Sequence, residues 1–256
     1  MPRVPGLASE VTLVNHPSRE TGGAWRGAQI VHAAWSDGAR WHVRAITDVA
    51  ADASIDVDQA GLPGDCPADA LPVLFLSPVN RDGEHTRLPA VDHMETVPAW
   101  RANIRLRSAT TAVSYQGEYP SGMAAIDGSL LSIAPLIQTG GGIATSLVFV
   151  NIRAQPAVDA HELRIVSAAT RRVVQRAVVR SNRCTVVALG AADGGERLRI
   201  VACDDMTGIP IYFSHDDGFT QMSLEHSHPP IEMAAFGARG AVNRAMKAAW
   251  SAAIAS

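Results

Sequence analysis

Two histidines two residues apart, His226 and His228, give this chain its clearest chemical signal. On a β-strand, residues i and i+2 project from one face, so the two imidazoles can bind one divalent metal ion such as zinc. His215, at the end of the preceding predicted strand, and Glu232, after a Pro-Pro bend, are candidates for the third ligand. With one coordination position left open, the bound water becomes acidic enough for hydrolysis.

The segment around these histidines is strongly acidic. Between Val201 and Glu232 it contains six carboxylates, three histidines and neither lysine nor arginine, which suits a cation. Two histidines at this spacing are also common by chance, and acidic loops between strands are usually only solvated. A metal-dependent hydrolase or lyase is therefore one hypothesis, and an ordinary surface segment is its alternative.

A second candidate site lies on a hairpin predicted over residues 29–48, with Asp37-Gly38 as its turn. A two-residue turn places Trp35 opposite Arg40, and strand alternation gives the two faces of the hairpin. Guanidinium groups beside an indole plane suit a sugar acid, a phosphate or another anionic ligand. The same pattern is also typical of cross-strand pairs that only stabilise a sheet. The outward set is Trp35, Arg40, His42 and Arg44, and the predicted core set is Ile30, Ala34, Trp41, Val43 and Ala45.

A third constellation combines Tyr115, Glu118 and Tyr119 near the end of a predicted strand. Two phenols and a carboxylate suit a polyol pocket in which Glu118 acts as an acid or a base. A structural corner is the alternative, because a Pro-Ser-Gly turn follows directly. A glycosidase needs a second carboxylate at a defined separation, and the sequence does not locate one.

Arginines are concentrated just before the acidic segment. Residues 150–200 contain nine arginines and four acidic residues. Alternation places Arg172, Arg176 and Arg180 on one face of a strand whose other face is apolar. Such a band can attract an acidic ligand or subunit, although a solvated sheet face has the same pattern.

Short alternating or apolar runs separated by turn residues predict an all-β protein. In the second half they recur every 8 to 14 residues, which is typical of an antiparallel β-sandwich. These runs are 162–167, 172–179, 183–189, 197–203, 209–214 and 221–226.

The run Leu147-Val-Phe-Val-Asn-Ile, followed by Pro156 and Leu163-Arg-Ile-Val, resembles the early strands of bacterial immunoglobulin-like or fibronectin-like modules. The resemblance covers residues 145–190. It implies a sandwich and carries no functional residues.

The C-terminus differs from the rest, because apolar residues from Val242 to Ile254 recur at three- and four-residue steps and predict an α-helix. Glycines and a proline crowd residues 117–128, which suggests an N-terminal β unit (1–118) and a C-terminal immunoglobulin-like sandwich plus helix (119–256). One large sandwich is the alternative.

Composition limits the functional classes. The formal net charge of −3 and the absence of interleaved aromatics in the arginine band argue against nucleic acid. No segment has the roughly 18 apolar residues of a membrane span, and no signal peptide is recognised. Three widely spaced cysteines fit a reducing compartment, so we expect a soluble, cytoplasmic protein, and the arginine and alanine bias suggests a bacterial one.

Because no complete catalytic motif is present, the sequence favours a non-catalytic binding or accessory module. Its partner is a carbohydrate-like or other anionic small molecule, or a protein, bound through a sheet face. The metal-dependent hydrolase or lyase and a structural subunit of a homo-oligomer are the alternatives, so the sequence does not decide whether the protein is an enzyme.

Overall fold

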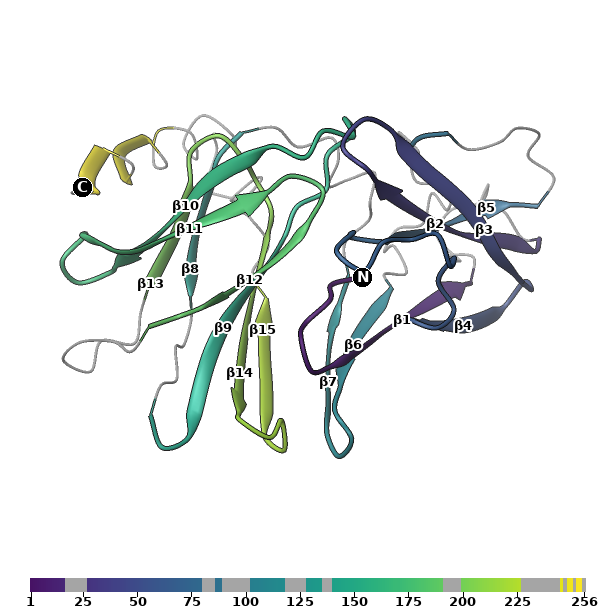
Figure 1. Ribbon diagram of the computed structural model, residues 1–256, viewed down its shortest axis with the longest axis horizontal. Coiled ribbons are helices and arrows are strands. Elements are labelled where there is room, and N and C mark those ends of the chain that lie inside the picture. The colour runs from purple at the N-terminus through teal and green to yellow at the C-terminus, as the bar shows by residue number, and fades with distance from the viewer. Residues whose placement is uncertain are drawn as a thin grey trace, which may run out of the picture. The chain divides into compact units, whose positions relative to one another are not determined.

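The computed structural model describes residues 1–16, 27–79, 86–88, 102–117, 128–134, 140–190, 199–226, 245, 248–250 and 252–254. Contacts divide the chain into two compact units (Figure 1). Unit 1 consists of Met1–Ile126, Ile152–Val158 and Asn182–Cys184. Unit 2 consists of Asp127–Asn151, Asp159–Ser181 and Thr185–Ser256.

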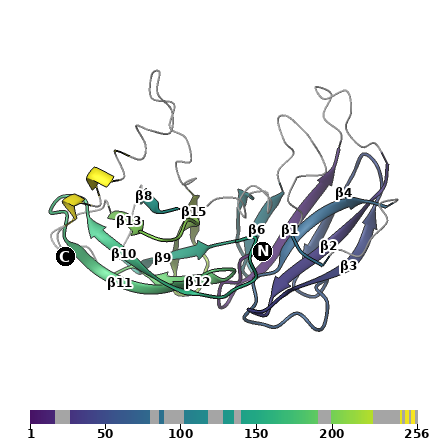
Figure 2. The same cartoon turned by 90° about the horizontal axis from the view of Figure 1, so that it is seen from above.

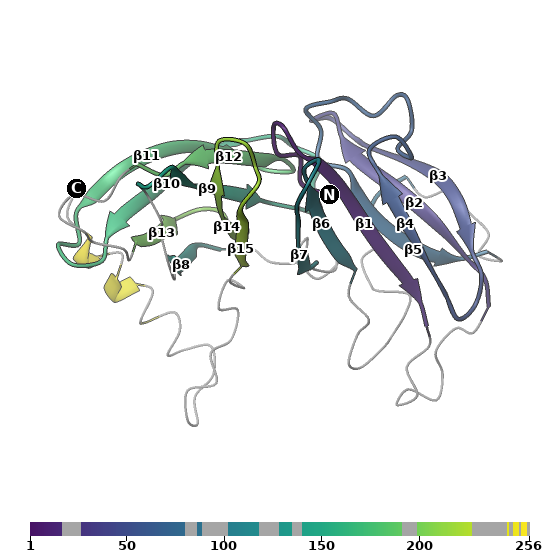
Figure 3. The same cartoon turned by 90° about the horizontal axis from the view of Figure 1, so that it is seen from below.

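Unit 1 contains two antiparallel sheets. The first has the order β4-β1-β6-β7 and the second the order β3-β2-β5. Figure 3 shows β1 running beside β6 in the first sheet. The strands are β1 (Ala8–Asn15), β2 (Gln29–Ser36), β3 (Trp41–Val49), β4 (Ala53–Asp58), β5 (Val73–Pro78), β6 (Asn103–Arg107) and β7 (Ala112–Gln116).

Unit 2 is also built from two antiparallel sheets, with the orders β11-β10-β13-β8 and β12-β9-β14-β15. Figure 2 shows β10 and β11 side by side. The strands are β8 (Leu130–Ala134), β9 (Ile143–Val150), β10 (Ala160–Ser167), β11 (Val173–Arg180), β12 (Cys184–Ala188), β13 (Arg199–Cys203), β14 (Ile209–Asp216) and β15 (Met222–His226).

Among the described residues, an apolar cluster lies in each unit, and each of these clusters draws residues from both sheets of its unit. Alternation explains which residues take part, because every second side chain of a strand points to the same side. In unit 1 the cluster includes Val11, Leu13, Val31, Ala33, Trp35, Val57 and Leu74. In unit 2 it includes Leu130, Leu147, Phe149, Leu163, Ile165, Val179, Val201 and Tyr212.

Strand β2 is the central strand of its sheet and is buried on both faces. Segment 152–158 lies beside the end of β2 and the start of β3, where Trp41 Nε1 donates to Ala154 O at 2.9 Å and Ser36 Oγ donates to Pro156 O. Asn182 fixes this segment: its Nδ2 donates to Gln155 O at 2.6 Å, and its Oδ1 accepts from Arg153 N at 2.7 Å. Side-chain amides thus replace strand pairing where the chain leaves the sheet.

The predicted antiparallel β-sandwich, with its immunoglobulin-like or fibronectin-like units, is wrong. The all-β composition is confirmed, but the strands form four small antiparallel sheets of the size found in β-propeller blades. Regular strand spacing misled the prediction, because it is the same in sandwiches and in blade-sized sheets. Spacing shows where strands occur and leaves open which strands pair.

Other predictions fare differently. The described positions 245, 248–250 and 252–253 are helical, within the segment where the sequence predicts a C-terminal helix. The predicted boundary between residues 118 and 119 lies outside the described residues and stays a prediction. Among the described residues, no helix is long and apolar enough to cross a membrane.

A glycine next to the core of unit 2 provides a test of its packing. A Cβ added to Gly208 would lie 2.8 Å from both Phe149 Cε1 and Val150 O, which is closer than atoms of these types approach. We expect Gly208→Ala to lower the free energy of unfolding by about 1–3 kcal/mol, as overpacking does. Denaturant melts followed by circular dichroism measure the change. Gly190→Ala is the matched control, because no atom of the described residues other than its chain neighbours lies within 4 Å of its added Cβ, and an equal effect there would refute the packing argument.

Candidate functional site

Strand β11 presents the most exposed large apolar side chains among the described residues. Val174 is 53% exposed and Val178 is 62% exposed. They alternate with Arg176 and Arg180 on the outward side of the strand, while Ala177 and Val179 face the core of unit 2. We call this set, Val174, Arg176, Val178 and Arg180 with the preceding Arg172, the β11 face.

Strand β11, which carries the β11 face, is the edge strand of its sheet. Within the described part of the chain, β11 pairs with β10 alone, in a register that places Val178 opposite Glu162 and Arg180 opposite Ala160. An edge strand has backbone N–H and C=O groups on its outer side that can pair with another strand. Within the described residues, the outer side of β11 therefore combines backbone donors and acceptors that have no strand partner with a regular pattern of side chains.

The charges of the β11 face are only partly compensated. Arg176 Nη1 lies 2.6 Å from Glu162 Oε1 on β10. Arg172 and Arg180 are exposed, and the described residues offer neither of them a salt bridge within 4.0 Å. Arg171, in the turn before β11, packs its guanidinium over the Trp250 ring at 5.1 Å. The face keeps a positive charge that can attract an acidic partner.

The sequence identified the arginines of this face correctly and overlooked the valines. The period that places Val173, Ala177 and Val179 inward also places Val174 and Val178 among the arginines. The even-numbered apolar residues of this strand are the sequence signal that identifies Val174 and Val178 as exposed.

The first hairpin forms as predicted over residues 29–48, but its register differs. Residues 37–40 form a four-residue loop, so Trp35 lies opposite His42 rather than Arg40. Trp35 is 2% exposed and belongs to the core of unit 1. Trp41 and Val43, from the predicted core set, are buried on the other face. Because β2 is buried on both faces, neither face of this strand is the outward, solvent-exposed one that the sequence predicted.

The predicted ligand residues of this hairpin do come together. The Trp35 and His42 rings stack with centroids 5.6 Å apart, and the Arg44 guanidinium lies 6.0 Å from the Trp35 ring. Each cation has a carboxylate nearby: Arg44 pairs with Asp65 at 3.1 Å, and Arg40 lies 3.7 Å from Asp37. A buried indole and compensated charges favour a sheet-stabilising cluster over a ligand site.

Asp37 organises the loop of this hairpin. Its Oδ2 is 2.7 Å from His42 Nε2, and its Oδ1 accepts from the backbone N–H groups of Ala39 and Arg40 at 2.8 and 2.9 Å. The hydrogen bond from His42, followed by the two backbone donors, holds the pKa of the Asp37 carboxyl far below its usual range.

Of the third constellation only Tyr115 is described, and it is buried on β7. Glu118 and Tyr119 lie outside the described residues, so the polyol pocket stays a prediction.

The proposed metal ligands are only partly described. The β14–β15 register places Ile211 opposite His226 and Met222 opposite His215, four rungs away. At about 3.4 Å per residue, the two histidine backbones are roughly 14 Å apart along the strands, and the metal site stays a prediction. The remaining candidates, His228 and Glu232, lie outside the described residues, and the residues that the structure does describe contain no cluster of three metal-ligating side chains.

Part of the acidic segment is occupied by basic groups of β10. Asp204 Oδ1 is 2.5 Å from Arg164 Nη2, and Asp205 Oδ2 is 3.0 Å from His161 Nδ1. The Cys203 thiol donates to Asp205 Oδ1 at 3.5 Å. This Cys-Asp-His group is unsuited to nucleophilic catalysis, because the carboxylate contacts both the thiol and the imidazole. Cys203 is also fully buried, and burial raises its pKa to about 11.

The loop contacts of Asp37 predict a specific response to pH. A carboxyl whose pKa is lowered by folding stabilises the protein above its ordinary pKa of about 4 and loses that contribution as the pH falls. We expect Asp37→Asn to lower the melting temperature at pH 7, with a difference from wild type that shrinks below about pH 4. Thermal melts between pH 2 and 7 measure this, and a difference independent of pH would show that the charge of Asp37 is irrelevant.

Protein-family models, curated proteins and solved structures were all compared with this chain, and none of the three comparisons found a match.

Proposed function

We propose that the protein is a non-catalytic binding module that recognises an acidic, extended segment of a partner protein through the β11 face. The observation that carries the proposal is the alternation of exposed valines with arginines on an edge strand. Exposed valines on an edge promote pairing with another strand, whereas arginines select for an acidic one.

The dimensions of the β11 face favour a chain over a small molecule. Its outward residues occur at every second position from Arg172 to Arg180. At about 3.4 Å per residue they extend over roughly 27 Å, far longer than a metabolite. A strand added to the edge of β11 would place its own alternate side chains beside these residues. Carboxylates would then meet Arg172 and Arg180, and apolar side chains would meet Val174 and Val178.

Two other polymer partners fit less well. Strand β11 has no aromatic residue on which a base could stack, which disfavours a nucleic acid. A second copy of the chain, paired through β11, would bring a second row of arginines and no carboxylate to this edge, and like charges across a strand pair destabilise a sheet. An acidic strand from a different protein avoids both problems.

The three cysteines among the described residues, Cys66, Cys184 and Cys203, are free thiols. Free thiols are typical of a reducing compartment, so we propose that the interaction takes place in the cytoplasm.

A designed peptide tests the proposal. Fluorescence anisotropy measures binding of the full chain to labelled Glu-Thr-Val-Thr-Glu-Thr-Val-Thr-Glu, whose outward side chains match the β11 face. We expect the double variant Arg172→Gln/Arg180→Gln to bind about tenfold more weakly, equivalent to about 1.4 kcal/mol. Raising the salt concentration should weaken binding of the peptide by the wild type, because salt screens the charges. Val174→Ser/Val178→Ser should weaken binding at low and at high salt alike, because the contacts that it removes are apolar.

Arg107→Gln is the matched control, because Arg107 is an exposed arginine at the end of β6 in unit 1. It should bind the peptide as wild type does. A peptide with lysine in place of glutamate should not bind. Equal binding of the lysine peptide, or unchanged binding by both β11 double variants, would contradict the proposal.

A further inference from the structure

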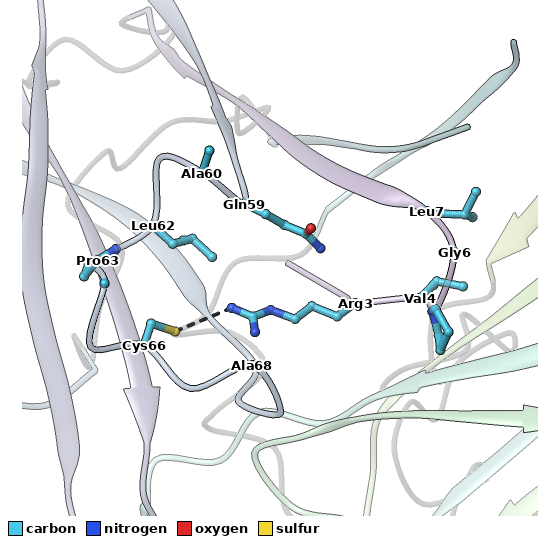
Figure 4. A pocket seen from close by; sticks show the side chains of 12 residues that line it. Arg3, Val4, Gly6, Leu7, Gln59, Ala60, Leu62, Pro63, Cys66 and Ala68 are labelled. Carbon is cyan, nitrogen blue, oxygen red and sulfur yellow. Dashed lines mark hydrogen bonds between the residues drawn. The ribbon is translucent and has the colours of Figure 1, made fainter. Parts of the chain in front are cut away.

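A pocket in unit 1, unrelated to the β11 face, has the size of a small-molecule site. It measures about 740 Å³ and lies between the segment before β1 and the connection from β4 to β5. Volumes of roughly 300–1,000 Å³ are typical of ligand pockets. Figure 4 shows Arg3 extending across the pocket toward Cys66, with Gln59 and Leu62 beside it.

The guanidinium of Arg3 is held in place by neutral groups. Its Nη1 donates to Pro67 O at 2.8 Å, and its Nη2 lies 3.7 Å from Cys66 Sγ. Its Nε is enclosed and has no hydrogen-bond partner in the described part of the chain, where no carboxylate lies within 4.0 Å of Arg3. A guanidinium has five N–H donors, so several are left for a ligand.

The thiol beside Arg3 does not compensate its charge. Burial raises the pKa of Cys66 above its ordinary value, which outweighs the opposite effect of Arg3, and the thiol is therefore neutral at pH 7. Asp65, which directly precedes Cys66 in the sequence, pairs with Arg44 at 3.1 Å. A partly buried cation without a counter-charge is costly, and an anion bound in the pocket would offset that cost.

The other walls indicate what kind of anion fits. Val4, Leu62 and Pro63 supply apolar surface, and Gln59 supplies an amide. A planar carboxylate matches the fork of a guanidinium, whereas an apolar body matches the side walls. We propose that this pocket binds a small organic carboxylate with an apolar body, with Arg3 as the residue that binds the carboxylate.

Benzoate is a suitable probe, and its neutral isostere benzamide is the matched ligand control. We expect benzoate to raise the melting temperature of the full chain saturably, and benzamide or an equal concentration of chloride to have no such effect. Arg3→Gln should weaken benzoate binding at least about tenfold, because it removes the charged fork. Arg107→Gln, in an exposed arginine outside the pocket, should bind benzoate as wild type does.

Two further measurements locate the bound acid and do not depend on Arg3. Cys66 lines the pocket, so benzoate should slow its alkylation by N-ethylmaleimide, followed by peptide mass spectrometry. Leu62→Trp should fill the pocket and abolish benzoate binding while the guanidinium is retained. Absence of saturable binding up to millimolar benzoate, equal binding by Arg3→Gln, or unchanged alkylation of Cys66 would overturn the proposal. None of these outcomes affects the β11 face, which is tested with the peptide.

Discussion

The two apolar clusters depend on the alternation of side chains along antiparallel strands. A strand offers only every second residue to a given side, so each cluster is complete only when strands of both sheets contribute. The place of a strand in its sheet then decides the fate of its other face. β2, in the centre of its sheet, is buried on both sides. β11, at an edge, has one face in the core and the other exposed to solvent.

Polar side chains complete the structure where strand pairing stops. In unit 1, the buried Asn15 donates to the carbonyl oxygens of Gly27 and Ala50 at 3.0 and 2.9 Å, and its own Oδ1 accepts from Gln29 Nε2 at 2.8 Å. Asn182 does the same for segment 152–158, from a left-handed backbone conformation with φ of 55° that asparagine tolerates better than most residues. Such residues satisfy buried backbone groups that have no strand partner.

Local features of the fold were predictable from the sequence, whereas its long-range features were not. The hairpin over residues 29–48 and the alternation along β11 follow from patterns within ten or twenty residues. The hairpin register was missed because Asp37 closes a four-residue loop through its own side chain, where the Asp-Gly dipeptide suggested a two-residue turn. The grouping of strands into four sheets depends on which distant strands pair, and period two carries no information about that. The pocket around Arg3 was invisible for the same reason, since Gln59 and Cys66 reach it only through the fold.

The interleaved strand order of unit 2 has a consequence for how the protein reaches its native state. β8 pairs with β13 and β9 with β14, so Leu130 must meet Cys203 and Val150 must meet Ile209 before these sheets exist. Closing such long loops costs conformational entropy before any contact repays it, and chains with this topology fold slowly, on the scale of milliseconds to seconds. During synthesis, β8 and β9 leave the ribosome well ahead of the strands that pair with them. Their apolar residues, Leu130, Leu147 and Phe149, then remain accessible to chaperones until β13 and β14 have been made.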